Sequence, residues 1–203
     1  MNFVLGIDGG GTSCRAALAT ADGTVIGRAK SGAGQVGADV GGAAFGGGWG
    51  FQVGDQGSGA RIGRDLLEQT LLAYDGVRAG SPLTHSMLAV FRNNPEDVVE
   101  FTTNAKPGDF GGFAPKVFEH AEKGDSVANW ILDRVVADVE ASLGALDLAD
   151  DAPLCLLGGL APLYAPRLSA RYQALLKPPL DDALGGAVQM AVRLFAGHAE
   201  ATR

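Results

Sequence analysis

The residues with the clearest chemical potential lie near the N-terminus, where an apolar run ends in Asp8, three glycines and Thr12. Glycines lack a Cβ, so their main-chain N–H groups can approach an anion closely and can adopt positive φ. Asp8 would repel a bound phosphate unless a cation lies between them, which predicts a Mg²⁺ ion or a water that bridges carboxylate and phosphate. The pattern therefore predicts a phosphate-binding loop with Gly10, Gly11 and Thr12 as donors.

A β-hairpin is the element predicted to position this loop. Residues 13–19 and 24–29 are typical of short strands, and Asp22-Gly23 between them is a two-residue turn that favours positive φ. Neither the G-x-x-x-x-G-K-[ST] P-loop nor the G-x-G-x-x-G dinucleotide pattern is present. A glycine-rich hairpin turn with an incidental carboxylate is the structural alternative.

Helices dominate the prediction for the rest of the chain. Helical spacing of apolar residues and good N-terminal residues predict helices over residues 60–74, 81–91, 95–101, 107–121 and 125–143. Residues 153–157 form a continuous apolar run, which is typical of a strand buried on both faces. The order of hairpin, helices, strand and helix predicts an α/β fold whose sheet is covered by helices.

Four segments carry a resemblance to a known family. Gly6 to Thr12 resembles the first phosphate motif of the actin-like ATPase and sugar kinase superfamily. Gly47 to Gly59 resembles the G-G-W-G-x-x-x-G-D-E-G-S-G sugar motif of the BadF/BadG/BcrA/BcrD ATPase family, which includes the N-acetylglucosamine and glucosamine kinases, with Gln56 in place of Glu. Leu154 to Gly159 is similar to the strand and double glycine near the nucleotide, and Asp182 to Ala187 is similar to the start of the closing helix.

This resemblance implies the fold and the activity. It implies an actin-like ATPase fold of the ribonuclease H-like type, with a partial N-terminal domain over residues 1–45 and a largely complete C-terminal domain over 46–203. It also implies transfer of phosphate from ATP to a hydroxyl of N-acetylglucosamine or glucosamine, the 6-hydroxyl being favoured. Asp8 would hold Mg²⁺ through water.

The resemblance further assigns the site residues. Those implied to contact ATP are Asp8, Gly10, Gly11, Thr12, Gly158 and Gly159, and those implied to contact the sugar are Gln35, Gly48, Trp49, Gly50 and Asp55. Taken on residue types alone, Trp49 is more typical of a core aromatic residue and Asp55 of a helix cap, and the resemblance reverses this preference.

One part of the family pattern has no counterpart in the sequence. In the family, a long stretch between the hairpin and the tryptophan motif carries an Asp that acts as catalytic base and a second, Gly-Thr-Gly-Ser, phosphate loop. Here residues 38–45 run almost directly into Gly46 to Trp49, through either a natural or engineered deletion or an omission from the sequence. Two alternatives to a kinase therefore stand: an ATPase that drives a partner protein, and a non-catalytic remnant that binds sugar or nucleotide.

Composition narrows the class of protein. The 203 residues are 46% hydrophobic with a formal net charge of −7, which favours a globular chain with a real core and argues against a nucleic-acid partner. No apolar run approaches the ~20 residues that span a bilayer, and the N-terminus lacks the pattern of a signal peptide, so we expect a cytoplasmic protein without a membrane partner. The family resemblance implies a homodimer. Cys14 and Cys155 are expected as small buried apolar residues, and His85, His120 and His198 lack metal-ligand spacing.

Overall fold

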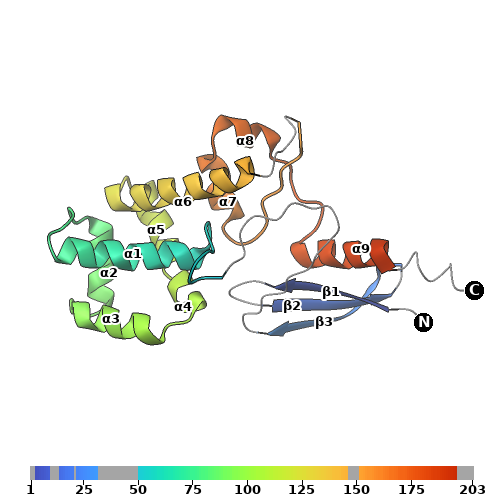
Figure 1. The fold of residues 1–203 in the computed structure, drawn as a ribbon, viewed down its shortest axis with the longest axis horizontal. Coiled ribbons are helices and arrows are strands. Elements are labelled where there is room, and N and C mark those ends of the chain that lie inside the picture. The colour runs from blue at the N-terminus through green and yellow to red at the C-terminus, as the bar shows by residue number, and fades with distance from the viewer. Residues whose placement is uncertain (1–2, 10–13, 21, 32–49, 146–150, 196–203) are drawn as a thin grey trace, which may run out of the picture. The chain divides into compact units, whose positions relative to one another are not determined.

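Two compact units make up the structure, a computed structural model that describes residues 3–9, 14–20, 22–31, 50–145 and 151–195. Unit 1 contains the hairpin strands together with residues 153–162 and 175–195. Unit 2 contains residues 50–145 and 151–152 together with 163–174. The expected linear division into 1–45 and 46–203 thus differs from the contacts, because the last helix groups with the hairpin. Figure 1 labels the elements of both units.

The sheet of unit 1 has the strand order β1-β2-β3, and both pairs are antiparallel. The strands are β1 (Phe3–Gly9), β2 (Cys14–Thr20) and β3 (Val25–Ser31). A turn is present at the predicted place, and Gly23 has the expected positive φ of +91°. The N–H of Thr20 donates to the carbonyl of Thr24 at 3.0 Å, so the loop between these two residues is one residue longer than the predicted two-residue turn.

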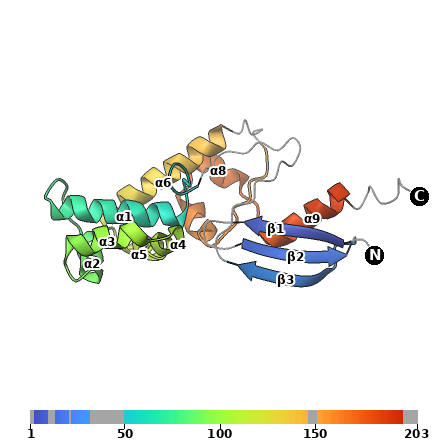
Figure 2. The ribbon, with the colours of Figure 1, turned by 60° about the horizontal axis from the view of Figure 1, so that its bottom comes forward.

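Helix α9 (Ala183–Phe195) covers the sheet of unit 1. Leu184, Val188 and Ala191 recur at helical spacing on one face of α9, and they form a buried cluster with Ala19 of β2. Both views show α9 running antiparallel to β1 (Figures 1 and 2). The N-terminal end of α9 and the C-terminal end of β1 therefore lie at the same end of the sheet.

Unit 2 is helical and built around α1. Its first six helices are α1 (Gly59–Tyr74), α2 (Pro82–Val90), α3 (Pro95–Asn104), α4 (Pro107–Gly111), α5 (Ala114–Glu122) and α6 (Ser126–Gly144). They are followed by α7 (Ala161–Tyr164), the 3-10 helix η1 (Ala165–Arg167) and α8 (Ala170–Leu175). The first two residues of α7 and the last residue of α8 are assigned to unit 1. Helix α1 packs against α2, α4, α5 and α6. Its buried face, with Ile62 and Leu66, joins Leu83 and Met87 of α2 and Ile131 of α6 in the core.

A close approach of backbones fixes how α1 and α4 pack. A Cβ at Gly63 would lie 1.9 Å from the carbonyl oxygen of Phe110, so only glycine fits there. The predicted start of α2 is confirmed: Ser81 is the N-cap, Pro82 is the first helical residue, and Ser81 and Thr84 form a reciprocal capping box. Across the described residues, no helix is both long enough and apolar enough to cross a membrane.

Two predicted elements differ from the structure. The single helix predicted over 107–121 is wrong, because Gly111 and Gly112 divide it into α4 and α5. The predicted strand at 153–157 is also wrong. Its described residues make one isolated parallel bridge, between Leu154 and Leu176, and Leu157 is 53% exposed. A strand is buried on both faces only where neighbours flank and cover it, and an apolar run does not by itself supply them.

The structure tests the predicted burial of one of the two cysteines. Cys155 is exposed, with its thiol donating weakly to the carbonyl of Pro178 at 3.9 Å, so its predicted burial is wrong. The side chain of Cys14 lies outside the described residues.

Candidate functional site

The predicted phosphate loop follows β1 at one end of the sheet. Asp8 is the penultimate residue of β1 and lies opposite Arg15 of β2 in the antiparallel register. Gly10, Gly11 and Thr12 lie outside the described residues. The N-terminal end of α9 lies at the same end of the sheet (Figures 1 and 2). A helix N-terminus carries partial positive charge, which here faces the carboxylates of Asp181 and Asp182.

Two aspartates shape the start of α9. The Asp182 carboxylate accepts a hydrogen bond from the N–H of Gly185 at 2.8 Å, and the Asp181 carboxylate accepts one from the N–H of Asp182 at 2.8 Å. A Cβ at Gly185 would lie 2.0 Å from an Asp181 carboxylate oxygen, so a larger residue there would require the exposed Asp181 side chain to move. The segment that resembles the start of the family's closing helix is therefore the start of α9.

Gly158 and Gly159, the predicted double glycine, have an exposed backbone. Gly158 has φ +102°, and a Cβ at either Gly158 or Gly159 would meet no atom within 4 Å. Both residues are exposed. Main chain that is free of covering side chains can approach a phosphate or a nucleoside closely, which is the role expected for these two glycines.

The part of the tryptophan motif that the structure describes is a tight turn before α1. Gly50 has φ +83° and Asp55 has φ +69°, and the N–H of Gly54 donates to the carbonyl of Gly50 at 2.8 Å. The N-cap of α1 is Ser58, whose hydroxyl accepts from the N–H of Arg61 at 3.1 Å. A capping role for the Asp55 side chain is thus wrong, and among the described residues no group donates to this half-buried carboxylate.

Tyr164 anchors this turn from a distant part of the chain. Its hydroxyl donates to the carbonyl of Gly57 at 2.9 Å, and the ring packs edge-on against Phe118 with centroids 5.9 Å apart. Burial raises the pKa of Tyr164, so the hydroxyl stays a donor. Gly57 has φ +81°, and a Cβ there would meet Val139 of α6 at 2.7 Å. The turn is therefore fixed to the helical core of unit 2.

Aromatic stacking holds the other end of the same turn. Phe51 and Phe110 of α4 have ring centroids 4.9 Å apart, and the guanidinium of Arg64 lies 5.8 Å from the Phe51 ring centroid. Gln35, Gly48 and Trp49 lie outside the described residues, so of the predicted sugar-binding residues the structure brings Gly50 and Asp55 together in one turn. Tyr164 and Phe51 are positioning residues that no motif indicated.

Helix α1, which follows this turn, carries a buried carboxylate at Asp65. Asp65 is 3% exposed, and Arg61 one turn earlier donates to its carboxylate at 3.1 Å. Burial raises the pKa of Asp65, and the nearby positive charges of Arg61 and Arg134 oppose this effect. The ion pair between Arg61 and Asp65 therefore orients Arg61 on α1, and burial of the Asp65 carboxylate opposes this stabilisation.

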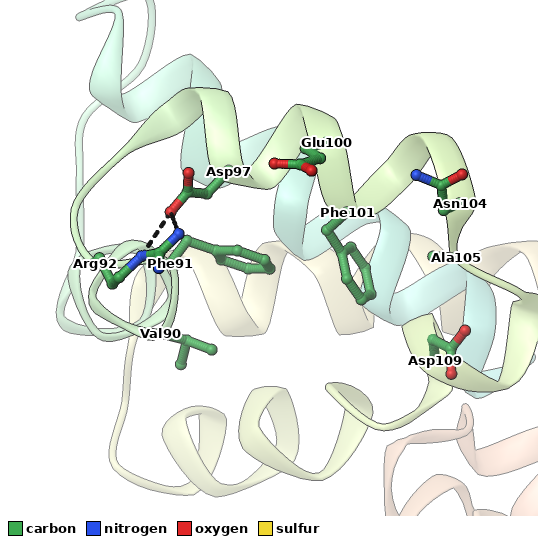
Figure 3. Close-up of a pocket in the computed structure, with 9 residues that line it drawn as sticks. All are labelled: Val90, Phe91, Arg92, Asp97, Glu100, Phe101, Asn104, Ala105 and Asp109. Atoms are coloured by element: carbon green, nitrogen blue, oxygen red, sulfur yellow. Dashed lines mark hydrogen bonds and ion pairs between the residues drawn. The ribbon is translucent and has the colours of Figure 1, made fainter.

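A pocket of about 570 Å³ lies over α2 and α3 (Figure 3). Its lining includes the rings of Phe91 and Phe101, and Arg92 donates to Asp97 at 2.6 and 2.9 Å at its edge. None of the predicted sugar or nucleotide residues lines this pocket. Among the described residues, no group of three His, Cys, Asp or Glu side chains is placed to hold a metal ion.

Comparison with known proteins establishes the family. The model of the BadF/BadG/BcrA/BcrD ATPase family matches residues 35–168, which include the tryptophan motif, helices α1–α6 and the double glycine. The chain belongs to this family. The resemblance drawn from the four sequence motifs is thereby confirmed.

Two curated relatives are similar to most of this chain. The glucosamine kinase of Vibrio cholerae is 37% identical over 154 residues, which are 76% of this chain and 51% of that protein. The N-acetyl-D-glucosamine kinase of Dictyostelium discoideum is 31% identical in an alignment of length 162 that covers 70% of this chain and 50% of that protein. The chain therefore spans about half the length of the curated relatives it matches.

A solved structure confirms the fold. The crystal structure of a candidate N-acetylglucosamine kinase from Chromobacterium violaceum superposes with a TM-score of 0.75 at 22% identity, covering 94% of this chain and 99% of that one. The predicted α/β, actin-like ATPase fold is thus confirmed.

Proposed function

We propose that this chain is an amino-sugar kinase that transfers phosphate from ATP to a hydroxyl of glucosamine or N-acetylglucosamine, at the 6-position. The observation that carries the proposal is the similarity to the Vibrio cholerae glucosamine kinase across 76% of the chain. The geometry supports it, because the turn with Gly50 and Asp55 offers a carboxylate to which no described residue donates and which can accept hydrogen bonds from sugar hydroxyls. Gln35, Gly48 and Trp49 stay the other predicted sugar-binding residues.

The nucleotide would bind in unit 1. Asp8 stands at the end of β1, and a single carboxylate together with phosphate oxygens is a usual ligand set for Mg²⁺. Gly10, Gly11 and Thr12 would donate to the phosphates, and Gly158 and Gly159 would let the nucleotide pass close to the backbone. The exposed backbone at these two glycines fits such a ligand.

Catalysis by these residues would rest on positioning and on charge. Mg²⁺ supplies neutralisation of the charge on the phosphates when it is bound. The backbone donors after β1 hold the phosphates, and the turn before α1 holds the sugar hydroxyl as acceptor. A general base adds about 10²–10⁴-fold to such a reaction, and the described residues contain none that the family motifs assign.

The cellular setting completes the proposal. We expect a homodimer that acts in the cytoplasm on a small amino sugar, with neither nucleic acid nor membrane as partner. The net charge of −7 supports the absence of a nucleic-acid partner.

Release of ADP in the presence and absence of sugar tests the proposal. Purified chain with Mg-ATP should release ADP only when glucosamine or N-acetylglucosamine is added, and mass spectrometry should find a sugar phosphate. Release of ADP without sugar would instead favour an ATPase that drives a partner protein. Binding of sugar or ATP by calorimetry without turnover would favour a non-catalytic remnant, which the missing counterpart of the family's base supports.

A further inference from the structure

Four of the six residues that line a second pocket of unit 2 carry a hydrogen-bond donor in the side chain. Its volume is about 310 Å³, at the lower end of the usual range for small-ligand sites, and it lies between the end of α1 and the start of α6. The residues that line it are Gln69, Arg78, Ala79, Ser126, Val127 and Trp130. None of them belongs to the predicted sugar or nucleotide sites.

Gln69 gives the pocket an unsatisfied donor. The residue is 4% exposed, and its carbonyl oxygen accepts from the Arg78 guanidinium at 3.0 Å. Its amide nitrogen has no partner among the described residues. No fully enclosed side-chain nitrogen or oxygen of the described residues lacks a hydrogen bond, so this nitrogen must open into the pocket that Gln69 lines. An amide donor that opens into a pocket is free to bind an acceptor, and a ligand oxygen can take the place of water there.

Arg78 gives the pocket a positive charge, and the ring of Trp130 forms one of its walls. The guanidinium of Arg78 and that of Arg134 each lie 4.7 Å from the centroid of the Trp130 ring. The hydrogen bond to Gln69 further orients Arg78, which keeps N–H groups free in the planar fork that matches carboxylate and phosphate oxygens. The arginine is therefore positioned before any ligand arrives.

The nearby carboxylates are already engaged. Asp65, one turn before Gln69 on α1, is paired with Arg61. Asp125, just before Ser126, accepts hydrogen bonds from the backbone N–H groups of Leu83, Val127 and Ala128. Positive charge and free donors thus predominate in this pocket, on a chain whose net charge is −7.

We propose that this pocket binds a small molecule through an oxyanion, a carboxylate or a phosphate, held by the Arg78 guanidinium and the Gln69 amide beside Trp130. The site is separate from the proposed kinase chemistry, and it would let an anionic metabolite bind unit 2 on its own. The hydroxyl of Ser126 at the first turn of α6 adds a further donor.

The indole N–H signals of the ¹⁵N-labelled full chain provide the test. The sequence has two tryptophans, Trp49 and Trp130, so Trp130→Phe assigns the two signals. Inorganic phosphate, acetate and chloride are added in turn at constant ionic strength. Saturable movement of the Trp130 signal by phosphate alone identifies a phosphate site, and movement by acetate as well identifies a site that accepts carboxylates. Movement by neither, or equally by chloride, overturns the proposal.

Two variants and a matched control separate this pocket from the nucleotide loop. Arg78→Gln changes an exposed side chain and should weaken oxyanion binding about tenfold or more. Gln69→Glu replaces the free donor with a carboxylate and should abolish binding. The control Arg171→Gln also removes an arginine stacked on an aromatic ring, that of Tyr172 at 5.4 Å, and should bind as the wild type does. If Arg78→Gln retains wild-type affinity, the oxyanion binds elsewhere and the proposal is wrong, whereas the kinase proposal is unaffected.

Discussion

Asp125 joins the starts of two helices, and its replacement should destabilise unit 2 strongly. One carboxylate oxygen accepts from the N–H groups of Val127 and Ala128 in the first turn of α6, at 3.0 Å each. The other accepts from the N–H of Leu83 in the first turn of α2, at 2.8 Å. Burial alone would raise the pKa of Asp125, but these donors, with the Ser81 hydroxyl, lower it below the usual value.

The cost of Asp125→Ala follows from what these groups lose. Loss of an N-cap costs about 1 kcal/mol, and leaving the N–H of Leu83 without a partner adds about 1–3 kcal/mol. We therefore expect the free energy of unfolding to fall by about 2–4 kcal/mol. Asp125→Asn should cost about 1–3 kcal/mol, because one oxygen cannot serve both helices and its amide N–H₂ would face a second donor.

Urea unfolding followed by circular dichroism measures both variants, with Asn94→Ala as the control. Asn94 caps α3 alone through the N–H of Glu96, so its loss should cost about 0.5–1 kcal/mol. The lowered pKa means that the contribution of Asp125 is complete above the ordinary aspartate pKa of about 3.9 and disappears as the pH falls through the folded value. The difference between wild type and Asp125→Asn should shrink accordingly in acid. The reasoning is refuted if Asp125→Ala costs no more than Asn94→Ala.

Three further changes test other features of unit 2. Burial raises the pKa of Asp65, so the wild type should lose stability as the pH rises from about 3.9, the ordinary aspartate pKa, towards the pKa of Asp65 in the folded protein. Asp65→Asn should remove that loss when thermal unfolding is measured across pH, and an unchanged dependence of stability on pH would contradict this. Gly63→Ala should lower the free energy of unfolding by more than about 2 kcal/mol, because its Cβ would overlap a carbonyl oxygen, whereas Gly76→Ala, at φ +72° in open space, should lower it by about 1 kcal/mol. Urea unfolding measures both variants, and equal losses would refute the expected order. Tyr164→Phe should cost about 0.5–1.5 kcal/mol in urea unfolding and weaken sugar binding several-fold by calorimetry, and unchanged sugar affinity would rule out a positioning role.

Local signals in the sequence predicted much of the helical unit. The start of α2 at Ser81-Pro82, the end of α1 at Asp75-Gly76 and the start of α6 at Asp125 all depend on residues close together in the chain. Such caps act within one turn, so a sequence contains all that is needed to recognise them. The apolar run at 153–157 misled because burial of a strand depends on neighbours that the run itself does not specify.

The contacts that organise the candidate sites were beyond the sequence because they join distant residues. Asp125 is recognisable as a helix cap, but its bond to Leu83 spans 42 residues, and the bond from Tyr164 to Gly57 spans 107. The family motifs identified Gly50 and Asp55 as sugar residues, and this stays a prediction. They gave no indication of Tyr164, because a tyrosine that supports a turn has no fixed spacing from it.

If the turn before α1 binds the sugar, as we propose, its anchoring makes sugar binding separable from phosphate transfer. Tyr164, Val139 and Phe110 hold this turn, and all three belong to unit 2. The residues that we propose to bind phosphate after β1 belong to unit 1. Changes that weaken the turn should therefore alter sugar affinity even without nucleotide, while changes at Asp8 should leave that affinity unaltered. Because Val139 lies on α6, the helix that Asp125 caps, loss of that cap should reach the sugar site through the packing of α6 against Gly57, whereas loss of the α3 cap should not.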